Sequence, residues 1–308
     1  MSASTSSPQW MLRKERGNLF WLSVMSTLSV RLGRRLSRVL LHAIALYFVV
    51  AVSAARKASR SYLDRCLGRR ASWLDTYRHV LAFASTVHDR IYLLNGRHDL
   101  FDFRTEQEGL ASVLKCIEQQ GAFLLGAHVG SFEVLRSLAS ADPRLNVSVA
   151  MYPENARRIN QTLAAINPKA VQDIIPLGHV DSMLRVNQAL KDGALVGILA
   201  DRAVRDDQSL ALPFLGAPAQ FPTGPFRLAA LMKRPVYFMV GLYRGGNRYD
   251  VHFEVLHDPA RDAALPRDAV VHEMLTRYVD ALERYCRSAP YNWFNFFDFW
   301  GSEGRAQP

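Results

Sequence analysis

The stretch FLLGAHVGSFE, residues 123–133, has the pattern of a buried strand, a turn and the start of a helix. Residues 122–127 are an apolar run of strand length, a glycine-containing turn follows, and the next segment has helical character. His128 therefore lies at the carboxyl end of a predicted strand, and Glu133 lies in the first turn of the next helix. Ligand sites in open α/β sheets lie at that edge. The stretch predicts a strand, turn and helix that carry a functional site.

The same alternation continues on both sides of this stretch. Further strands are predicted at residues 147–151, 174–176 and 194–199. Helices are predicted at residues 73–94, 106–120, 131–140, 182–191 and 269–287. Residues 236–243 and 249–256 flank a Gly-Gly turn, which predicts a hairpin. We therefore expect an α/β fold with a mixed, largely parallel sheet flanked by helices.

The charge of the chain is concentrated at one end. The 308 residues are 49% apolar and 21% charged, which excludes a disordered chain, and their net charge is +10. Residues 1–98 hold 16 Lys and Arg against 4 Asp and Glu, whereas residues 99–308 hold 22 against 24. We expect residues 1–98 to form a basic helical region that associates with membranes, and residues 99–308 to form the α/β domain.

One apolar run lies inside the basic region. Residues 39–55 contain no charged side chain, but seventeen residues are at the short limit for a membrane span. Positive charge flanks both ends, so the positive-inside rule gives no orientation. This symmetry favours a helix that lies on an anionic membrane surface. A true span and a buried core helix remain alternatives.

The cysteines and the carboxyl-terminal aromatic residues give less specific signals. Cys66, Cys116 and Cys286 are widely spaced without a CxxC pair, which is typical of reduced thiols in a cytosol-facing protein. Residues 291–300 hold seven aromatic side chains, which either pack on the core or lie at the level of lipid headgroups.

His128 and Glu133 suggest general base chemistry. A carboxylate that orients one imidazole nitrogen lets the other nitrogen take a proton near neutral pH. No GxSxG motif or reactive cysteine accompanies the pair, so the nucleophile would be a hydroxyl of the substrate. The backbone N–H groups of Gly130 and Ser131, at a helix start, are predicted to bind an anionic group or a developing oxyanion.

The order of several motifs resembles a known family. His-x4-Glu is followed by Leu-Ala-Asp-Arg (199–202), Leu-Pro-Phe-Leu-Gly (212–216) and Phe-Pro-Thr-Gly-Pro (221–225). This order resembles that of the late acyltransferases of bacterial lipid A synthesis, a branch of the lysophospholipid acyltransferase superfamily. The similarity runs from about residue 106 to residue 300, and the N-terminal third matches only in being basic, apolar and helical.

The resemblance implies a lysophospholipid acyltransferase-like fold and transfer of a fatty acyl chain. The donor would be a thioester of an acyl carrier protein or of coenzyme A, and the acceptor a hydroxyl of a membrane glycolipid or lysolipid. The reaction would take place at the cytoplasmic face of the inner membrane. His128 would deprotonate the acceptor and Glu133 would hold His128, with no metal and no cofactor.

Other site residues are expected from the same resemblance. Asp201 matches an acidic position of the family, although it also fits a turn or helix cap. Arg202 replaces the family's usual polar residue there. Thr223 is predicted to cap a helix. The family places this loop beside the active site, so the resemblance also implies a substrate contact for Thr223.

Two departures from the family concern cations. The usual Tyr-Arg-Pro is Met-Tyr-Pro at 151–153, and a later arginine of the family has only Lys169 as a counterpart. Arg157 and Arg158 are candidates to replace these cations. The departures indicate a divergent branch that acts on a different acceptor.

Two other classes of function compete with the acyltransferase. The basic region is compatible with nucleic-acid binding, but its cations surround an apolar run instead of forming a polar stripe with stacking aromatics, so we expect no nucleic-acid partner. A catalytically silent membrane scaffold is the second alternative, and the intact His128 and Glu133 argue against it.

Overall fold

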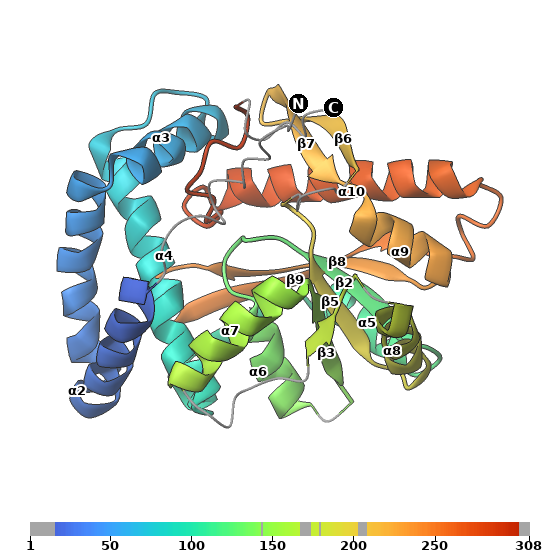
Figure 1. The fold of residues 1–308 in the computed structure, drawn as a ribbon, viewed down its shortest axis with the longest axis horizontal. Helices are drawn as coiled ribbons and strands as arrows, with labels where there is room; N and C mark the ends of the chain where they lie inside the picture. The colour runs from blue at the N-terminus through green and yellow to red at the C-terminus, as the bar shows by residue number, and fades with distance from the viewer. Residues whose placement is uncertain (1–15, 143, 167–173, 179, 203–207, 302–308) are drawn as a thin grey trace, which may run out of the picture.

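The computed structural model describes residues 16–142, 144–166, 174–178, 180–202 and 208–301 (Figure 1). The main sheet has the order β1-β9-β8-β2-β5-β3-β4. Its strands are β1 (Asp102–Thr105), β2 (Ala122–Gly126), β3 (Val147–Met151), β4 (Ile174–Pro176), β5 (Leu195–Leu199), β8 (Val236–Tyr243) and β9 (Arg248–His257). Only the β8 and β9 pair is antiparallel. The expected mixed, largely parallel sheet and the hairpin are confirmed.

Both faces of the sheet are covered, which explains why β2 is apolar at every position. Phe123 and Leu125 belong to one core, with α10 (Arg267–Ser288) and α9 (Gly224–Met232). Leu124 belongs to a second core on the other face, with α5 (Gln107–Ile117) and α6 (Glu133–Ala141). Successive strand residues point to opposite faces, so a strand between two layers of helices is buried throughout.

The remaining elements complete the layers seen in Figure 1. They are α7 (Pro153–Ile166), α8 (Val180–Lys191), and a separate antiparallel pair made of β6 (Ser209–Phe214) and β7 (Ala217–Pro222). Leu215 and Gly216 join this pair, both with positive φ. Positive φ at both central residues is the requirement of a tight hairpin turn whose twist matches the strands.

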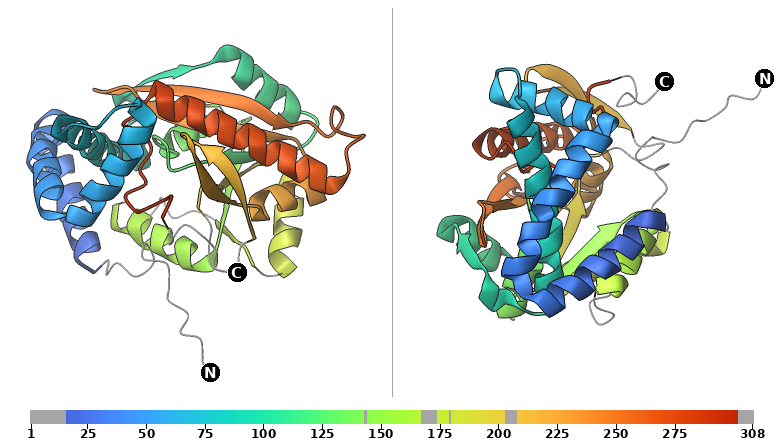
Figure 2. Two further views of the ribbon diagram at one scale, coloured as in Figure 1. Left: turned by 90° about the horizontal axis from the view of Figure 1, so that it is seen from above. Right: turned by 90° about the vertical axis from the view of Figure 1, so that its left-hand side faces the viewer.

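The N-terminal helices stack at one end of the molecule (Figures 1 and 2). They are α2 (Arg16–Ala51), α3 (Ser53–Leu67) and α4 (Trp73–Leu94). The helical path of α2 is interrupted at Gly33, where φ is 75°. Ser72 starts α4 with a capping box, in which its side chain and Asp75 satisfy each other's backbone N–H groups.

The apolar run at residues 39–55 does not form one continuous helix. The chain breaks at Val52, and the helices on either side of it are bent by 95°. Within the described residues no single helix is long and apolar enough to cross a membrane, although the bent pair passes that test together. Arg56, one of the cations that follow the apolar run, donates to the carbonyl oxygens of Val49 and Val50 at the end of α2.

A buried ion pair joins the N-terminal helices to the sheet. Asp89 on α4 has no exposed surface and accepts hydrogen bonds from Arg34 at 2.9 and 3.1 Å. The hydroxyl of Tyr249, on β9, donates to the same carboxylate at 2.9 Å. Arg38 lies 3.7 Å from it. Since α2, α4 and β9 all contribute, this network joins the helical layer to the second strand of the sheet.

Candidate active site

His128 lies where the first motif predicts it, two residues past the end of β2. Its carbonyl oxygen accepts from the Phe294 backbone N–H at 2.7 Å, and Val129 forms an isolated bridge with Trp293. The carboxyl-terminal segment therefore pairs with the turn after β2. The His128 side chain is 31% exposed, so a substrate can reach it.

Asp201 is the carboxylate that holds His128. The His128 Nδ1 atom lies 2.7 Å from Asp201 Oδ1, and the His128 backbone N–H donates to Oδ2 at 3.1 Å. Asp201 lies two residues past the end of β5, which pairs with β2 so that Gly126 faces Leu199. The register of two parallel strands thus brings the two residues together. These contacts agree with the site role expected for Asp201. They do not agree with a role as a turn or helix cap.

Glu133, expected to hold His128, is paired with Arg90 in this arrangement, and Asp201 bonds the His128 ring. Glu133 begins α6 and is directed to α4, where its Oε1 atom lies 3.4 Å from the Nε atom of Arg90. Gly130 turns the chain between His128 and α6, with φ of 63°. The turn sends the Glu133 carboxylate to a neighbouring helix while Asp201 occupies the Nδ1 side of the ring.

The surroundings favour a neutral imidazole and an ionised aspartate. Burial lowers the pKa of His128, and the positive charge of Arg202 lowers it further, although Asp201 opposes both effects. Burial alone would raise the pKa of Asp201, but its contacts with His128 and with Arg202 hold that pKa well below its usual value. An ionised carboxylate only accepts hydrogen bonds, so Nδ1 carries the proton and the Nε2 lone pair remains available.

Gly130 and Ser131 do not provide the expected oxyanion donors. The Gly130 N–H donates to the carbonyl oxygen of Asn292 at 2.8 Å, and the Ser131 N–H donates to that of Gly241 at 2.9 Å. A Cβ atom at residue 130 would collide with the Gly241 carbonyl. Both N–H groups are therefore used by the backbone, and glycine is required by the close approach and the positive φ.

The carboxyl-terminal aromatic segment packs on the core and completes the site. Trp293 is fully buried, and its indole N–H donates to Asp201 Oδ2 at 3.1 Å. His79 on α4 lies 2.8 Å from the Trp293 carbonyl oxygen through Nε2. Burial lowers the pKa of His79 to about 4, so this ring is neutral as well. Sequence reasoning missed both residues, although the density of aromatic residues marked the segment.

Arg202 is held by the same segment. Its Nε atom donates to the side-chain oxygen of Asn295 at 2.8 Å, and one terminal nitrogen donates to the Phe294 carbonyl oxygen at 3.1 Å. The guanidinium also lies 5.4 Å from the Phe297 ring centre. Arg202 is therefore beside the site, with two of its nitrogens already bonded.

The other site residues expected from the sequence lie in different parts of the molecule. Thr223 precedes α9, but its hydroxyl donates to the Gln208 carbonyl oxygen at 2.9 Å and makes no cap bond to the helix. Arg157 is exposed on α7. Arg158 lies on the same helix, and its side chain is outside the described part of the structure. Lys169 lies outside the described residues.

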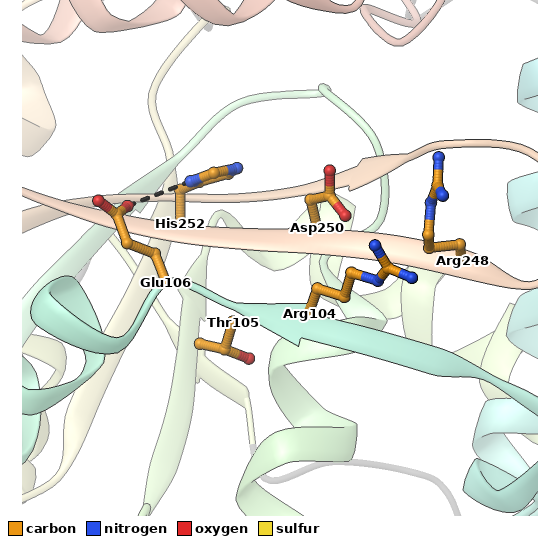
Figure 3. A pocket seen from close by; sticks show the side chains of 6 residues that line it. All are labelled: Arg104, Thr105, Glu106, Arg248, Asp250 and His252. Atoms are coloured by element: carbon orange, nitrogen blue, oxygen red, sulfur yellow. Dashed lines mark hydrogen bonds and ion pairs between the residues drawn. The ribbon is translucent and has the colours of Figure 1, made fainter.

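A separate surface hollow lies on β1 and β9, at the edge of the sheet (Figure 3). Its lining carries both signs of charge, and the His252 ring bonds Glu106 at 3.1 Å. The lining residues are Arg104, Thr105, Glu106, Arg248, Asp250 and His252. None of the site residues expected from the sequence lines this hollow. In the described ranges no group of three or more His, Cys, Asp or Glu side chains is placed to hold a metal ion.

Comparison with known families gives the reaction class. The chain matches the model of the bacterial lipid A biosynthesis acyltransferases over residues 6–301. This match includes the N-terminal helices as well as the α/β domain. A search of curated proteins found no match. Because the family model covers nearly the whole chain and the His128 site lies inside it, the chain belongs to the lipid A biosynthesis acyltransferase family and is an acyltransferase.

Proposed function

We propose that the chain transfers a fatty acyl group from an acyl carrier protein thioester, or from acyl-CoA, to a hydroxyl of a membrane glycolipid or lysolipid. The observation that carries this proposal is the pair formed by His128 and Asp201, with Nδ1 bonded and Nε2 open. Family membership supports acyl transfer, and the geometry supports a general base without a protein nucleophile.

The proposed step begins with proton transfer from the acceptor hydroxyl to His128 Nε2. The acceptor oxygen attacks the thioester carbonyl carbon, the carbon–sulfur bond breaks, and an ester forms. The proton then passes from Nε2 to the leaving thiolate, which restores the neutral imidazole. Asp201 stabilises the imidazolium and fixes the ring orientation, since its carboxylate accepts three hydrogen bonds in this site.

The lowered pKa of His128 suits this role. A base that is already neutral near pH 7 does not have to lose a proton before it can act. Protonation of the ring at lower pH removes the base, so the rate is expected to fall as the pH drops through the lowered pKa of His128.

We further propose that the second part of α2 attaches the protein to an anionic membrane surface. Leu41, Ala45 and Val49 are buried on its inner face. The outer face shows apolar side chains that are 41–64% exposed, at helical spacing. These are Leu36, Val39, Leu40, Leu46, Tyr47, Phe48 and Val50. Such an apolar stripe is the usual contact of an interfacial helix with lipid.

Nearby charge and the donor chemistry favour the cytoplasmic leaflet of the inner membrane. Arg35, Lys57 and Arg60 are exposed close to the stripe in sequence, where anionic headgroups attract cations. Acyl carrier protein and acyl-CoA are cytosolic donors, and the three cysteines are free thiols. We place the protein at that face as a peripheral or shallowly inserted enzyme.

The decisive experiment compares two histidine variants of the full chain in vesicles that contain the acceptor. We expect His128→Ala to lower acyl transfer from the thioester by about 10³-fold, within the usual range for a general base. His257→Ala is the matched control, because His257 Nδ1 lies 2.7 Å from Asp262 in a buried pair of the same type. Transfer by His128→Ala at the parent rate would refute the proposed mechanism.

A further inference from the structure

One face of α4 passes along the active site. His79 contacts the Trp293 carbonyl oxygen, and the Phe83 ring packs against Phe294 with ring centres 5.3 Å apart. Arg90 follows seven residues later, at the helical spacing that keeps it on the same face. Trp293 and Phe294 are the residues that bond Asp201 and the His128 backbone. Further along the same helix, Arg90 pairs with Glu133, five residues after the histidine.

Arg90 is oriented by Glu133 and keeps unused donors. Its Nε atom faces Glu133 Oε1 at 3.4 Å, and no hydrogen bond of its guanidinium is found among the described residues. The Arg90 side chain is 29% exposed, whereas that of Glu133 is 11% exposed. A nearly buried carboxylate thus holds an arginine whose outer nitrogens face solvent.

Two arginines near the active site differ in what they can still bind. Arg202 and Arg90 both act on the imidazole through their charge. Arg202 already donates to Asn295 and to the Phe294 carbonyl oxygen. Arg90 has only its ion pair in the described part of the chain, so its planar pair of terminal nitrogens is available to an anionic oxygen.

We propose that Arg90, held in place by Glu133, binds an anionic oxygen of the substrate beside His128. This inference rests on the proposed acyl transfer and assigns a positioning role to Glu133, which acts through Arg90 and not through the histidine. The oxygen has two chemical sources. It is either the carbonyl oxygen of the thioester, which becomes negative in the transition state, or a phosphate of the acceptor lipid.

The test measures kcat and KM of the purified full chain with phosphorylated and dephosphorylated forms of one glycolipid acceptor. We expect Arg90→Gln to reduce kcat/KM by about 10- to 100-fold, as for loss of a charge-assisted hydrogen bond. A lower kcat with both acceptors would show that Arg90 binds the thioester oxygen that becomes negative in the transition state. A higher KM for the phosphorylated acceptor alone would show that Arg90 binds a phosphate of the acceptor lipid. Arg90→Lys should recover part of the loss.

A double-mutant cycle tests whether Glu133 acts through Arg90. Glu133→Gln should impair the same kinetic parameter as Arg90→Gln, and adding it to Arg90→Gln should have little further effect. Arg97→Gln is the control, because Arg97 lies just beyond α4 in an exposed pair with Asp99. Arg90→Gln should also move the acidic limb of the pH profile to higher pH, which a loss of packing alone would not do.

The outcomes separate this inference from the proposed function. If Arg90→Gln keeps the parent kcat and KM while His128→Ala is inactive, the Arg90 inference is overturned and the acyl transfer proposal stands. If Glu133→Gln retains its full effect in the Arg90→Gln background, the positioning role is overturned. Melting curves that match the parent for Arg90→Gln exclude unfolding as the cause of any loss.

Discussion

The N-terminal helices α2 to α4 and the sheet with its flanking helices, which we call the α/β domain, use charged and apolar side chains in opposite ways. In the α/β domain the apolar residues of β2 are buried on both faces, and the ionised Asp201 is enclosed at the site. In the second part of α2 the charged Arg34 points inwards to Asp89, while Val39 and Val50 are exposed. The basic region is therefore not a uniformly solvated surface.

This difference indicates that the N-terminal region contributes side chains near the active site in addition to the exposed apolar stripe, for which we propose membrane attachment. One side of the helical layer presents apolar residues, and another side brings His79 and Arg90 to the site through α4. The net charge of the region is consistent with both tasks. Membrane contact and the support of the active site are therefore not divided cleanly between the two regions of this chain.

The largest expected effect concerns the buried carboxylate of the α/β domain. Asp201→Asn removes the charge that stabilises the imidazolium, and we expect acyl transfer to fall by about 10³-fold, or about 4 kcal/mol in activation free energy. Asp262→Asn, in the second His–Asp pair, should leave turnover near the parent value. Initial rates with a labelled thioester donor measure both. Equal losses in the two variants would contradict the assignment.

The next effect concerns the attachment of the two regions to each other. Asp89→Asn leaves Arg34 and Arg38 without a buried counter-charge, and we expect the free energy of unfolding to fall by about 3 kcal/mol. Asp99→Asn, which breaks only an exposed pair, should not change stability measurably. Urea unfolding followed by circular dichroism gives both values. An unchanged midpoint for Asp89→Asn would show that the network does not join the regions.

A smaller effect is expected at the apolar stripe of α2. The double variant Tyr47→Glu and Val50→Glu should weaken binding to anionic vesicles by about tenfold, because two exposed apolar side chains no longer enter the lipid. Leu184→Glu is the matched control, since Leu184 is 65% exposed on α8 of the α/β domain. Sedimentation with anionic vesicles measures the fraction of each variant that is bound to lipid. Equal weakening by the control would indicate a different membrane face.

The smallest expected effect is a shift in pH dependence. Because the Arg202 charge helps to lower the pKa of His128, Arg202→Gln should move the acidic limb of kcat/KM to higher pH. The base is active when neutral, so the rate falls as pH decreases through that pKa. Arg202→Lys should leave the limb near its parent position. A shift of the acidic limb to lower pH in Arg202→Gln would contradict the statement that the Arg202 charge lowers the pKa of His128.

Much of the fold follows from local patterns in the sequence. Each parallel strand is a short apolar run bounded by turn residues. The observed bounds of β3 and β4 agree with the predicted residues 147–151 and 174–176. The break at Val52 was not predictable from hydropathy, because apolar residues continue on both sides of it. The edge strand β1 is not predicted because it has only four residues, of which two are charged and exposed and one is apolar.

The site was only partly predictable for a topological reason. His128 is marked by its place after an apolar strand, but its carboxylate partner comes from β5, a strand that becomes a neighbour only in the folded sheet. Spacing along the chain favoured Glu133, which the turn at Gly130 directs to Arg90 instead. Trp293 and His79 reach the site from distant segments, and no local pattern predicts those contacts.

We infer that His128, held by Asp201, is the base of an acyl transfer to a membrane lipid. Lipid mass spectrometry of cells that lack the gene, complemented by the parent, His128→Ala or His257→Ala, tests it most directly. We predict a lipid that is heavier by one acyl chain with the parent and with His257→Ala, and its absence with His128→Ala. The same acylated lipid in cells that carry only His128→Ala would contradict the account.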